Sequence, residues 1–447
     1  MTAIGHDPGT SSISLNAEQR VPVAPQHLTF LDRTIRSAEQ TNLCLVLELR
    51  PGLDVQLLAE ALTLVAEGDE VLRMRIVAEG GRYDYVCQTR SAVALRVIER
   101  EPTFRVSDDS SAKLEELERC VGALDPLADG RLMAASVVCA GQRAWLFVKA
   151  SHLAFDQHAL GLLFTRWTEA YWSLSGLSSP TLGVRRYRYS DFLRDADASR
   201  EQTRDFWKAQ LARSEPNFLL DIDRSGERTS QLFVWRDEPC GQKELMAACR
   251  AARVWKFPFL FSLFLIALRR HASADTLLVS STVLGRTKPE HMEMIGAFSS
   301  LILSRVVVEP SMKVGELLQD TSRRLADYQL RLNVSRRDLL EFSGRDDFAH
   351  FTFLPPYLSP AQAPADERIF VTYELLHKST IETVPDISAR ATVQPDCLRV
   401  RYNYCPARLS EASFVAIADT YSHILQLAVS NPGDIAALSV AAVLARC

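Results

Sequence analysis

Residues 143–167 read RAWLFVKASHLAFDQHALGLLFTRW, and this stretch decides the prediction of the fold. In Arg143 to Ala150 every second residue from Leu146 onward is apolar and would lie on one face, which is typical of a strand. After Asp156 the apolar residues recur with helical spacing. The sequence therefore predicts a strand, a short connection that carries His152, and an amphipathic helix.

His152 is the candidate for chemistry in this connection. Imidazole titrates near neutral pH, so it can accept a proton from an amine or alcohol that attacks a carbonyl. The same position also suits a core histidine that is held by a hydrogen bond to the backbone. Its place at the end of a strand does not choose between a general base and a core residue.

Asp156 has two interpretations. As the N-cap of the helix, its side chain would accept the free N–H groups of the first turn. As the partner of a buried arginine, it would fix the loop that carries His152. Ser151 and His152 are neighbours on a strand and point to opposite faces, so no Ser-His-Asp triad is predicted. Ser151 is interpreted as structural, and His158 as a packing or surface residue.

Both halves of the chain mix strands with helices. The expected helices are 26–36, 55–68, 114–124, 191–213, 243–253, 257–270 (interrupted near its start by Pro258), 314–332 and 409–429; the expected strands are 44–49, 72–76, 143–150, 277–283, 301–308, 387–393 and 398–404. Residues 175–180 have a linker composition, and 355–364 contain four prolines and are expected to form a loop. We predict a flexible tail at 1–20, an N-terminal lobe at 21–178, a C-terminal lobe at 179–447, and a ligand site in a crevice between α/β lobes.

Composition excludes several classes of function. The net charge of -4 gives no electrostatic reason to expect nucleic acid or an anionic membrane as a partner. The nine cysteines have no C-x-x-C spacing, so neither a disulfide framework nor a metal site follows, and a reducing cytoplasm is expected. The longest apolar run, 257–268, is too short to span a bilayer. A basic and aromatic cluster at 185–189 is interpreted as a solvated face or as a contact for an acidic protein.

The connecting stretch, Ser151 to Gln157, resembles the His-His-x-x-x-Asp-Gly motif of condensation domains of nonribosomal peptide synthetases, in the chloramphenicol acetyltransferase-like superfamily. His152 and Asp156 match the second histidine and the aspartate of that motif. Ser151 and Gln157 stand where the family has histidine and glycine. Other segments are similar to the family in the same order, and the likeness extends over most of the chain: 70–73, 124–132, 189–192, 206–207, 283–286, 295–305 and 401–404.

The resemblance implies an α/β (α+β) fold of two chloramphenicol-acetyltransferase-like lobes, a V-shaped pseudo-dimer with a central tunnel. An acyl or peptidyl thioester on a carrier protein and a small-molecule or carrier-bound amine or alcohol acceptor would meet at His152. Asp156 would pair with Arg286 and be structural. Ser300 stands where asparagine is usual and is expected to line the tunnel.

The resemblance also implies the setting of the reaction. No cofactor is expected to be bound, because the phosphopantetheine arm is supplied by the carrier. Since no adenylation, carrier or thioesterase segment follows residue 430, we expect a free-standing, monomeric condensation enzyme of natural-product biosynthesis, such as antibiotic biosynthesis.

The two departures from the motif leave alternatives open. Loss of the first histidine and a side chain at Gln157 would retune the acceptor site, or they would mark a domain that has lost catalysis and recruits a partner enzyme to a carrier-bound chain. A third reading is epimerisation of a carrier-bound residue, for which the sequence shows no second acid or base. An active transferase is favoured because His152 is retained.

Overall fold

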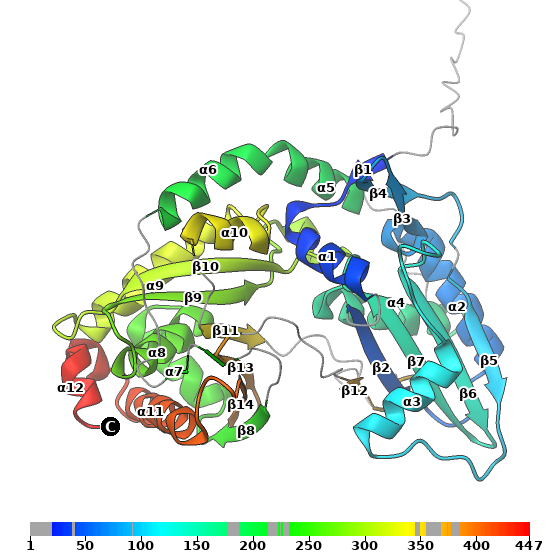
Figure 1. The fold of residues 1–447 in the computed structure, drawn as a ribbon. Coiled ribbons are helices and arrows are strands. Elements are labelled where there is room, and N and C mark those ends of the chain that lie inside the picture. The colour runs from blue at the N-terminus through cyan, green and yellow to red at the C-terminus, as the bar shows by residue number, and fades with distance from the viewer. Residues whose placement is uncertain are drawn as a thin grey trace, which may run out of the picture.

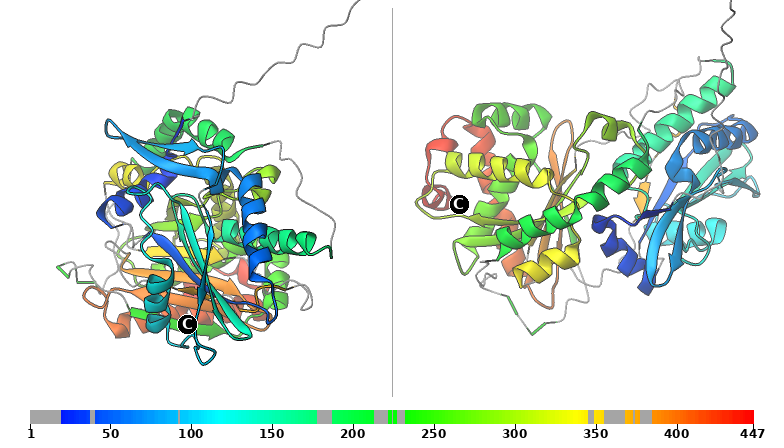
Figure 2. Two further views of the ribbon diagram at one scale, coloured as in Figure 1. Left: turned by 90° about the vertical axis from the view of Figure 1, so that its right-hand side faces the viewer. Right: turned by 90° about the horizontal axis from the view of Figure 1, so that it is seen from above.

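The computed structural model describes residues 20–37, 41–91, 93–177, 187–212, 222–223, 225–226, 232–344, 349–354, 368–372, 374–376 and 385–447. Nearly all of the predicted tail, the end of the predicted linker, Arg185 and Arg186, and the proline-rich loop lie outside these residues. Figure 1 shows two lobes that meet at the top and lean apart, as the resemblance predicted. The right-hand view in Figure 2 places the blue and cyan elements of the first lobe and the red elements of the second at opposite ends.

The first lobe is built on a five-stranded sheet of order β12-β2-β7-β6-β5. The strands are β12 (Glu374–Leu376), β2 (Asn42–Glu48), β7 (Arg143–Ser151), β6 (Met133–Ala140) and β5 (Leu95–Glu99). Helices α2 (Val55–Gly68) and α4 (Gln157–Leu174) cover one face, and α3 (Ser110–Val121) covers the other. In β7, Leu146 and Val148 enter the core under α2 and α4, whereas Trp145 and Phe147 face α3. The strand is therefore buried on both faces.

A smaller sheet of order β1-β4-β3 lies beside it, with β1 (Arg20–Pro22), β4 (Arg82–Cys87) and β3 (Met74–Glu79). The strand expected from residue 72 begins later, because Glu70–Arg73 form a 3-10 turn, η3. The first predicted helix is also divided, into the turn η1 (Pro25–His27) and helix α1 (Leu28–Arg36).

The second lobe is built on a six-stranded sheet of order β10-β9-β11-β13-β14-β8. Its strands are β10 (Ser300–Val307), β9 (Thr276–Val283), β11 (Ala349–Leu354), β13 (Ile387–Val393), β14 (Leu398–Tyr404) and β8 (Leu232–Glu238). The helices of this lobe are α7 (Gln242–Ala252), α8 (Lys256–Arg270), α9 (Val314–Gln329), α10 (Arg336–Ser343), α11 (Glu411–Ser430) and α12 (Val440–Leu444). Pro258 does not interrupt α8, because it lies in the first turn, where its missing N–H costs nothing.

The two faces of this sheet differ in chemistry. The alternate residues Ala389, Ala391, Val400 and Tyr402 are buried against the helices. The residues between them, on β13 and β14, are polar and face the first lobe. An alternation of period two therefore gives the sheet of the second lobe one apolar face, which packs against helices, and one polar face, which is suited to binding a ligand.

Several described segments from beyond residue 178 contact the first lobe. Strand β12 pairs with β2, and Ile369 and Phe370 enter the first core. The segment after β9, which includes the turn η4 (Pro289–Glu293), buries Met294, Ile295 and Phe298 in the same core. Residues 179–447 are therefore not confined to one lobe, since these crossings supply apolar side chains and strand hydrogen bonds that the first lobe lacks.

The helix predicted over 191–213 is two helices, α5 (Tyr189–Ala198) and α6 (Arg200–Leu211), which part at Ser199. Tyr189 and Leu193 of α5 belong to the first core, whereas Trp207 of α6 belongs to the second. The pair runs across the top of the molecule (Figure 1). Packing thus passes from one lobe to the other at Ser199, some twenty residues after the predicted boundary.

Among the described residues, no single helix is long and apolar enough to cross a membrane, although α7 and α8, which are bent by 85° to one another, satisfy the criterion as a pair.

Candidate active site between the lobes

His152 lies in the turn that follows β7, at the wall of the first lobe. Its backbone N–H donates to the carbonyl of Thr41 over 3.1 Å, which fixes the turn against the start of β2. The ring of Phe30, from α1, stacks on the imidazole with 4.7 Å between the ring centroids and 10° between the planes. The imidazole is therefore held from both the strand side and the helix side.

The protonation state of His152 follows from its contacts. Its Nδ1 lies 3.2 Å from the carbonyl oxygen of Phe155, and a carbonyl can only accept, so Nδ1 carries a proton. Burial lowers the pKa of His152 to about 4; Asp156 opposes the shift, and Arg33 adds to it. At neutral pH the ring is neutral, and Nε2 carries the lone pair that a general base needs.

Asp156 caps helix α4 and also binds the second lobe. Its Oδ1 accepts from the N–H of Ala159 over 2.8 Å, as an N-cap does. Its Oδ2 accepts from the N–H groups of Phe298 and Ser299 over 2.9 and 3.2 Å. Since the residue is only 3% exposed, this carboxylate is a buried link between the lobes.

Arg286 is the positive partner of this carboxylate. Its guanidinium lies 3.3 Å from Oδ1 of Asp156 and donates to the carbonyls of Met294 and Gly296 over 2.6 and 3.0 Å, and to that of His291. The same group lies 4.3 Å from the ring centroid of Phe298. The structure thus brings Asp156 and Arg286 together and encloses them with carbonyl oxygens, so neither interpretation of Asp156 excludes the other.

Gly285 allows this arrangement of the chain. Its φ of 73° is in the left-handed region, and a Cβ at this position would lie 1.8 Å from the carbonyl oxygen of Phe298. A side chain here would push apart the two chain segments that carry Arg286 and Phe298.

The other predicted site residues lie close by. Ser151 is fully buried, and its hydroxyl accepts from the N–H of Leu153 over 3.3 Å. Gln157 is the first residue of α4 and lines the cavity described below. Ser300 also lines it and donates to the carbonyl of Leu332 over 2.8 Å. His158 is buried, with Nε2 2.9 Å from the carbonyl of Met292, and therefore packs rather than lying on the surface.

A cavity of about 530 Å³ separates the two lobes at this level. The first lobe contributes His152, Phe30 and Arg33, and the second contributes side chains from β9, β11, β13 and β14. Such a volume holds a ligand of small-molecule size. The candidate base is therefore at a cavity to which both lobes contribute, as the crevice prediction required.

The wall of the second lobe contains site residues that were not predicted from the sequence. His350 of β11 lies 2.9 Å from the hydroxyl of Ser280 and 2.6 Å from that of Thr352. Arg390 and Asn403 line the same wall from β13 and β14. The alternation of residues 350–354, His-Phe-Thr-Phe-Leu, is a strand signal with its polar side chains on one face, and it could have identified His350.

No cluster of three or more histidine, cysteine or acidic side chains that could hold a metal ion occurs within the described ranges. The cavity combines one neutral imidazole, a second imidazole among hydroxyls, and several guanidinium groups.

Comparison with known proteins identifies the class. The condensation-domain family model matches residues 18–437, and the chain belongs to this family. It is 25% identical over 337 residues to a linear gramicidin synthase of Brevibacillus parabrevis, in an alignment that covers 70% of this chain but only 6% of that protein. It is 24% identical over 334 residues to the phosphinothricin tripeptide synthetase PhsC of Streptomyces viridochromogenes, covering 71% of this chain and 30% of that protein. The chain thus spans a small part of the curated relatives that it matches.

Solved structures agree on the fold. The first condensation domain of the calcium-dependent antibiotic synthetase superposes with a TM-score of 0.71 at 18% identity, covering 95% of this chain and 99% of that one. The X-domain from teicoplanin biosynthesis superposes with a TM-score of 0.72 at 17% identity, covering 96% and 98%. At these identities the likeness shows a shared two-lobed fold and does not distinguish one activity from another.

Proposed function

We propose that this protein transfers an acyl or peptidyl group from a carrier-protein thioester to an amine or hydroxyl acceptor. The observation that carries the proposal is the neutral imidazole of His152, with Nδ1–H bound to a carbonyl, at the wall of a cavity between two lobes. Membership of the condensation-domain family supports the same proposed activity.

The mechanism follows from this geometry. The acceptor nitrogen or oxygen attacks the thioester carbonyl while Nε2 of His152 takes its proton. The C–S bond then breaks, the new amide or ester forms, and the proton passes from His152 to the departing thiolate. Asp156 and Arg286 take no part in this transfer; they hold the turn of His152 and the start of α4 against the second lobe.

The test is turnover by intact-protein mass spectrometry, with an acylated carrier protein and a panel of amines and alcohols. His152→Ala is expected to lower the rate by about a hundredfold or more, the usual contribution of a positioned base. The matched control is His423→Ala, because His423 lies exposed on α11, outside the cavity. Both variants are checked by thermal melting. Full activity in a folded His152→Ala would overturn the role of this residue.

A second candidate is a catalytically silent domain that recruits a partner enzyme to a carrier-bound chain. One observation favours it: Gln157 lines the cavity at the position where the motif has glycine. The two candidates differ in the same experiment. Stable binding of the acylated carrier, with no loss of its acyl mass for any acceptor and with no effect of His152→Ala, supports recruitment. Gln157→Gly would then be expected to leave binding unchanged.

A further inference from the structure

The polar face of the second sheet includes a buried arginine that has no anionic partner in the part of the chain that the structure describes. Arg401 of β14 is only 7% exposed. Its Nε has no hydrogen-bond partner, and within the described part of the chain no carboxylate forms an ion pair with its guanidinium. A buried charge of this kind is costly, and native proteins usually pair it.

The strand register makes the position more unfavourable. Arg390 of β13 stands directly opposite Arg401 in an antiparallel pair, so the two side chains share one face of the sheet. Like charges that face each other across strands are destabilising. The stability of the sheet therefore does not explain why two arginines stand opposite each other here.

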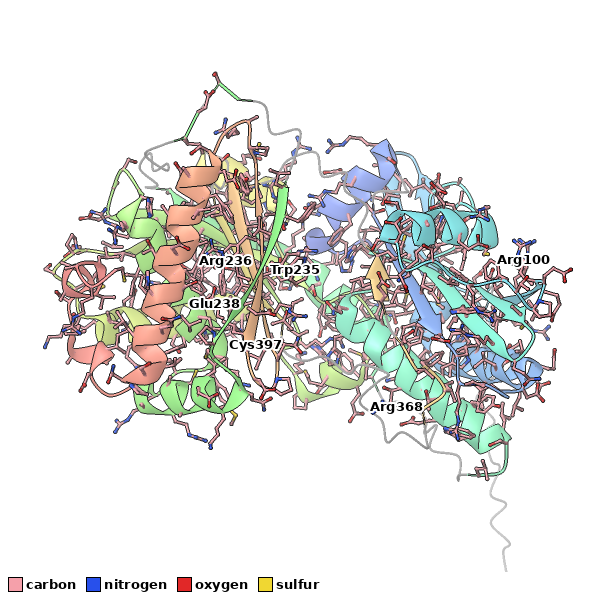
Figure 3. All side chains as sticks on the ribbon, turned by 90° about the horizontal axis from the view of Figure 1, so that it is seen from below. Arg100, Trp235, Arg236, Glu238, Arg368 and Cys397 are labelled. Carbon is pink, nitrogen blue, oxygen red and sulfur yellow. The ribbon has the colours of Figure 1, made fainter. Side chains whose placement is uncertain are left out.

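Two aromatic rings of β8 lie against the guanidinium of Arg401. Its guanidinium carbon lies 5.5 Å from the ring centroid of Phe233 and 5.8 Å from that of Trp235, both on the edge strand β8. Trp235 is 60% exposed and lies on the face of β8 opposite Arg236 and Glu238, whose side chains turn toward α11 (Figure 3). Arg401 is thus walled by aromatic rings at the open edge of the sheet.

The same face continues into the cavity of His152. Arg390 and Asn403, the residues that flank Arg401 on this face, both line that cavity. The amide oxygen of Asn403 is buried and, among the described residues, has no hydrogen-bond partner. An anion at Arg401 would therefore be part of a molecule that extends toward the candidate base.

The electrostatics agree with the geometry. Burial lowers the pKa of Arg401 to about 10, and the charge of Arg390 acts in the same direction. Every cause acts against the positive charge of Arg401, so an anion placed beside it would stabilise the charged guanidinium.

We propose that Arg401 and Arg390 bind an anionic group of a substrate that enters the cavity, a carboxylate or a phosphate. Guanidinium groups bind both through paired N–H donors, and the aromatic walls reduce screening by water. The assignment of the anion to a substrate rests on the proposed acyl transfer. Two sources share this chemistry: a carboxylate on the acceptor, and the phosphate of the carrier's phosphopantetheine arm.

Anion binding is tested first, without turnover. Isothermal titration with sodium sulfate at constant ionic strength is compared for the wild-type protein, Arg401→Gln and Arg399→Gln. Arg399 is the matched control, because it lies on the same face of β14 and loses the same charge, but it is already paired with Asp237 at 2.7 and 2.8 Å. Arg401→Gln is expected to weaken sulfate binding about tenfold, the usual loss for a charge-assisted hydrogen bond.

Turnover then identifies the source of the anion. If the anion belongs to the acceptor, Arg401→Gln raises the KM for a carboxylate acceptor about tenfold and leaves that for its methyl ester unchanged. If it is the arm, the KM rises for a phosphopantetheine thioester and not for the pantetheine thioester. Arg401→Lys, which keeps the charge but not the paired donors, should fall between wild type and Arg401→Gln.

Failure of the anion site is distinct from failure of the proposed function. Sulfate binding that is equal in wild type and Arg401→Gln, or reduced equally by Arg399→Gln, overturns the anion site whatever the turnover. Arg401-dependent sulfate binding without transfer of any acyl group retains the site and contradicts the transferase.

Discussion

Arg286 and Arg401 are both buried arginines of the second half of the chain, and their surroundings are opposite. Arg286 contacts the carboxylate of Asp156 and three carbonyl oxygens. Arg401 faces another arginine and two aromatic rings. One guanidinium has a carboxylate partner within the protein, and the other has none among the described residues.

The difference separates a structural charge from a charge kept for a ligand. The oxygens around Arg286 join the start of α4 to the segment before β10, so their effect is on the folded state. Among the described residues Arg401 forms no ion pair that joins two segments, and its burial adds a desolvation cost. The contrast predicts that removal of the two side chains will have opposite effects on stability.

The largest expected effect is that of Arg286→Ala. It leaves the carboxylate of Asp156 buried without its cation, and such losses cost about 3–5 kcal/mol. Urea unfolding followed by circular dichroism would measure the change in the free energy of unfolding. The control is Arg399→Ala, which breaks an exposed ion pair and should cost less than about 1 kcal/mol. Equal losses in the two variants would show that the link through Asp156 does not stabilise the protein.

The first-lobe wall could be predicted because its residues are adjacent in sequence. In residues 143–174 the apolar side chains alternate along the strand and recur with helical spacing along the helix, and the sequence shows both periods. His152, Asp156 and Gln157 lie between the end of the strand and the first residue of the helix, so a correct prediction of the strand and the helix locates all three. The predicted helix 55–68 and the strands 387–393 and 398–404 coincide with α2, β13 and β14 for the same reason.

The second-lobe wall could not be assembled from the sequence. It takes one or two residues from each of several strands, and the parallel pairings of β11 with β9 and β13 join segments far apart in the chain. Both strands that carry Arg390 and Arg401 were predicted, but only the register shows that these residues are opposite each other. Strand β8, which carries Trp235, has no clear period and was missed.

The effect of pH comes next in size. The pKa of His152 is about 4 in the folded protein and near 6.5 when the chain is unfolded. Between these values the unfolded chain binds a proton that the folded one does not, so stability falls as pH drops from 6.5 to 4. His152→Gln is expected to remove roughly 3 kcal/mol of this loss. The remaining slope would include His27, whose pKa burial also lowers to about 4.

The pH dependence of kcat/KM should report the same pKa of His152. A base acts when it is neutral, so with a hydroxyl acceptor, which does not titrate in this range, kcat/KM is expected to stay level from about pH 7 down to about pH 5 while the protein is folded. A decline in kcat/KM with a midpoint near 6.5 would show that His152 titrates as an ordinary exposed histidine, and would contradict its burial at the turn.

The smallest expected effect is that of Arg401→Met, and its sign distinguishes a ligand-binding charge from a structural one. Methionine replaces the aliphatic part of the arginine side chain with a flexible apolar one, while it removes a buried charge and its repulsion from Arg390. In chloride buffer the free energy of unfolding should be unchanged or higher by up to about 1 kcal/mol. In sulfate the wild type should gain stability relative to the variant, because an anion that binds only the folded state stabilises it. A loss of about 2 kcal/mol or more in chloride would instead make Arg401 a structural residue like Arg286.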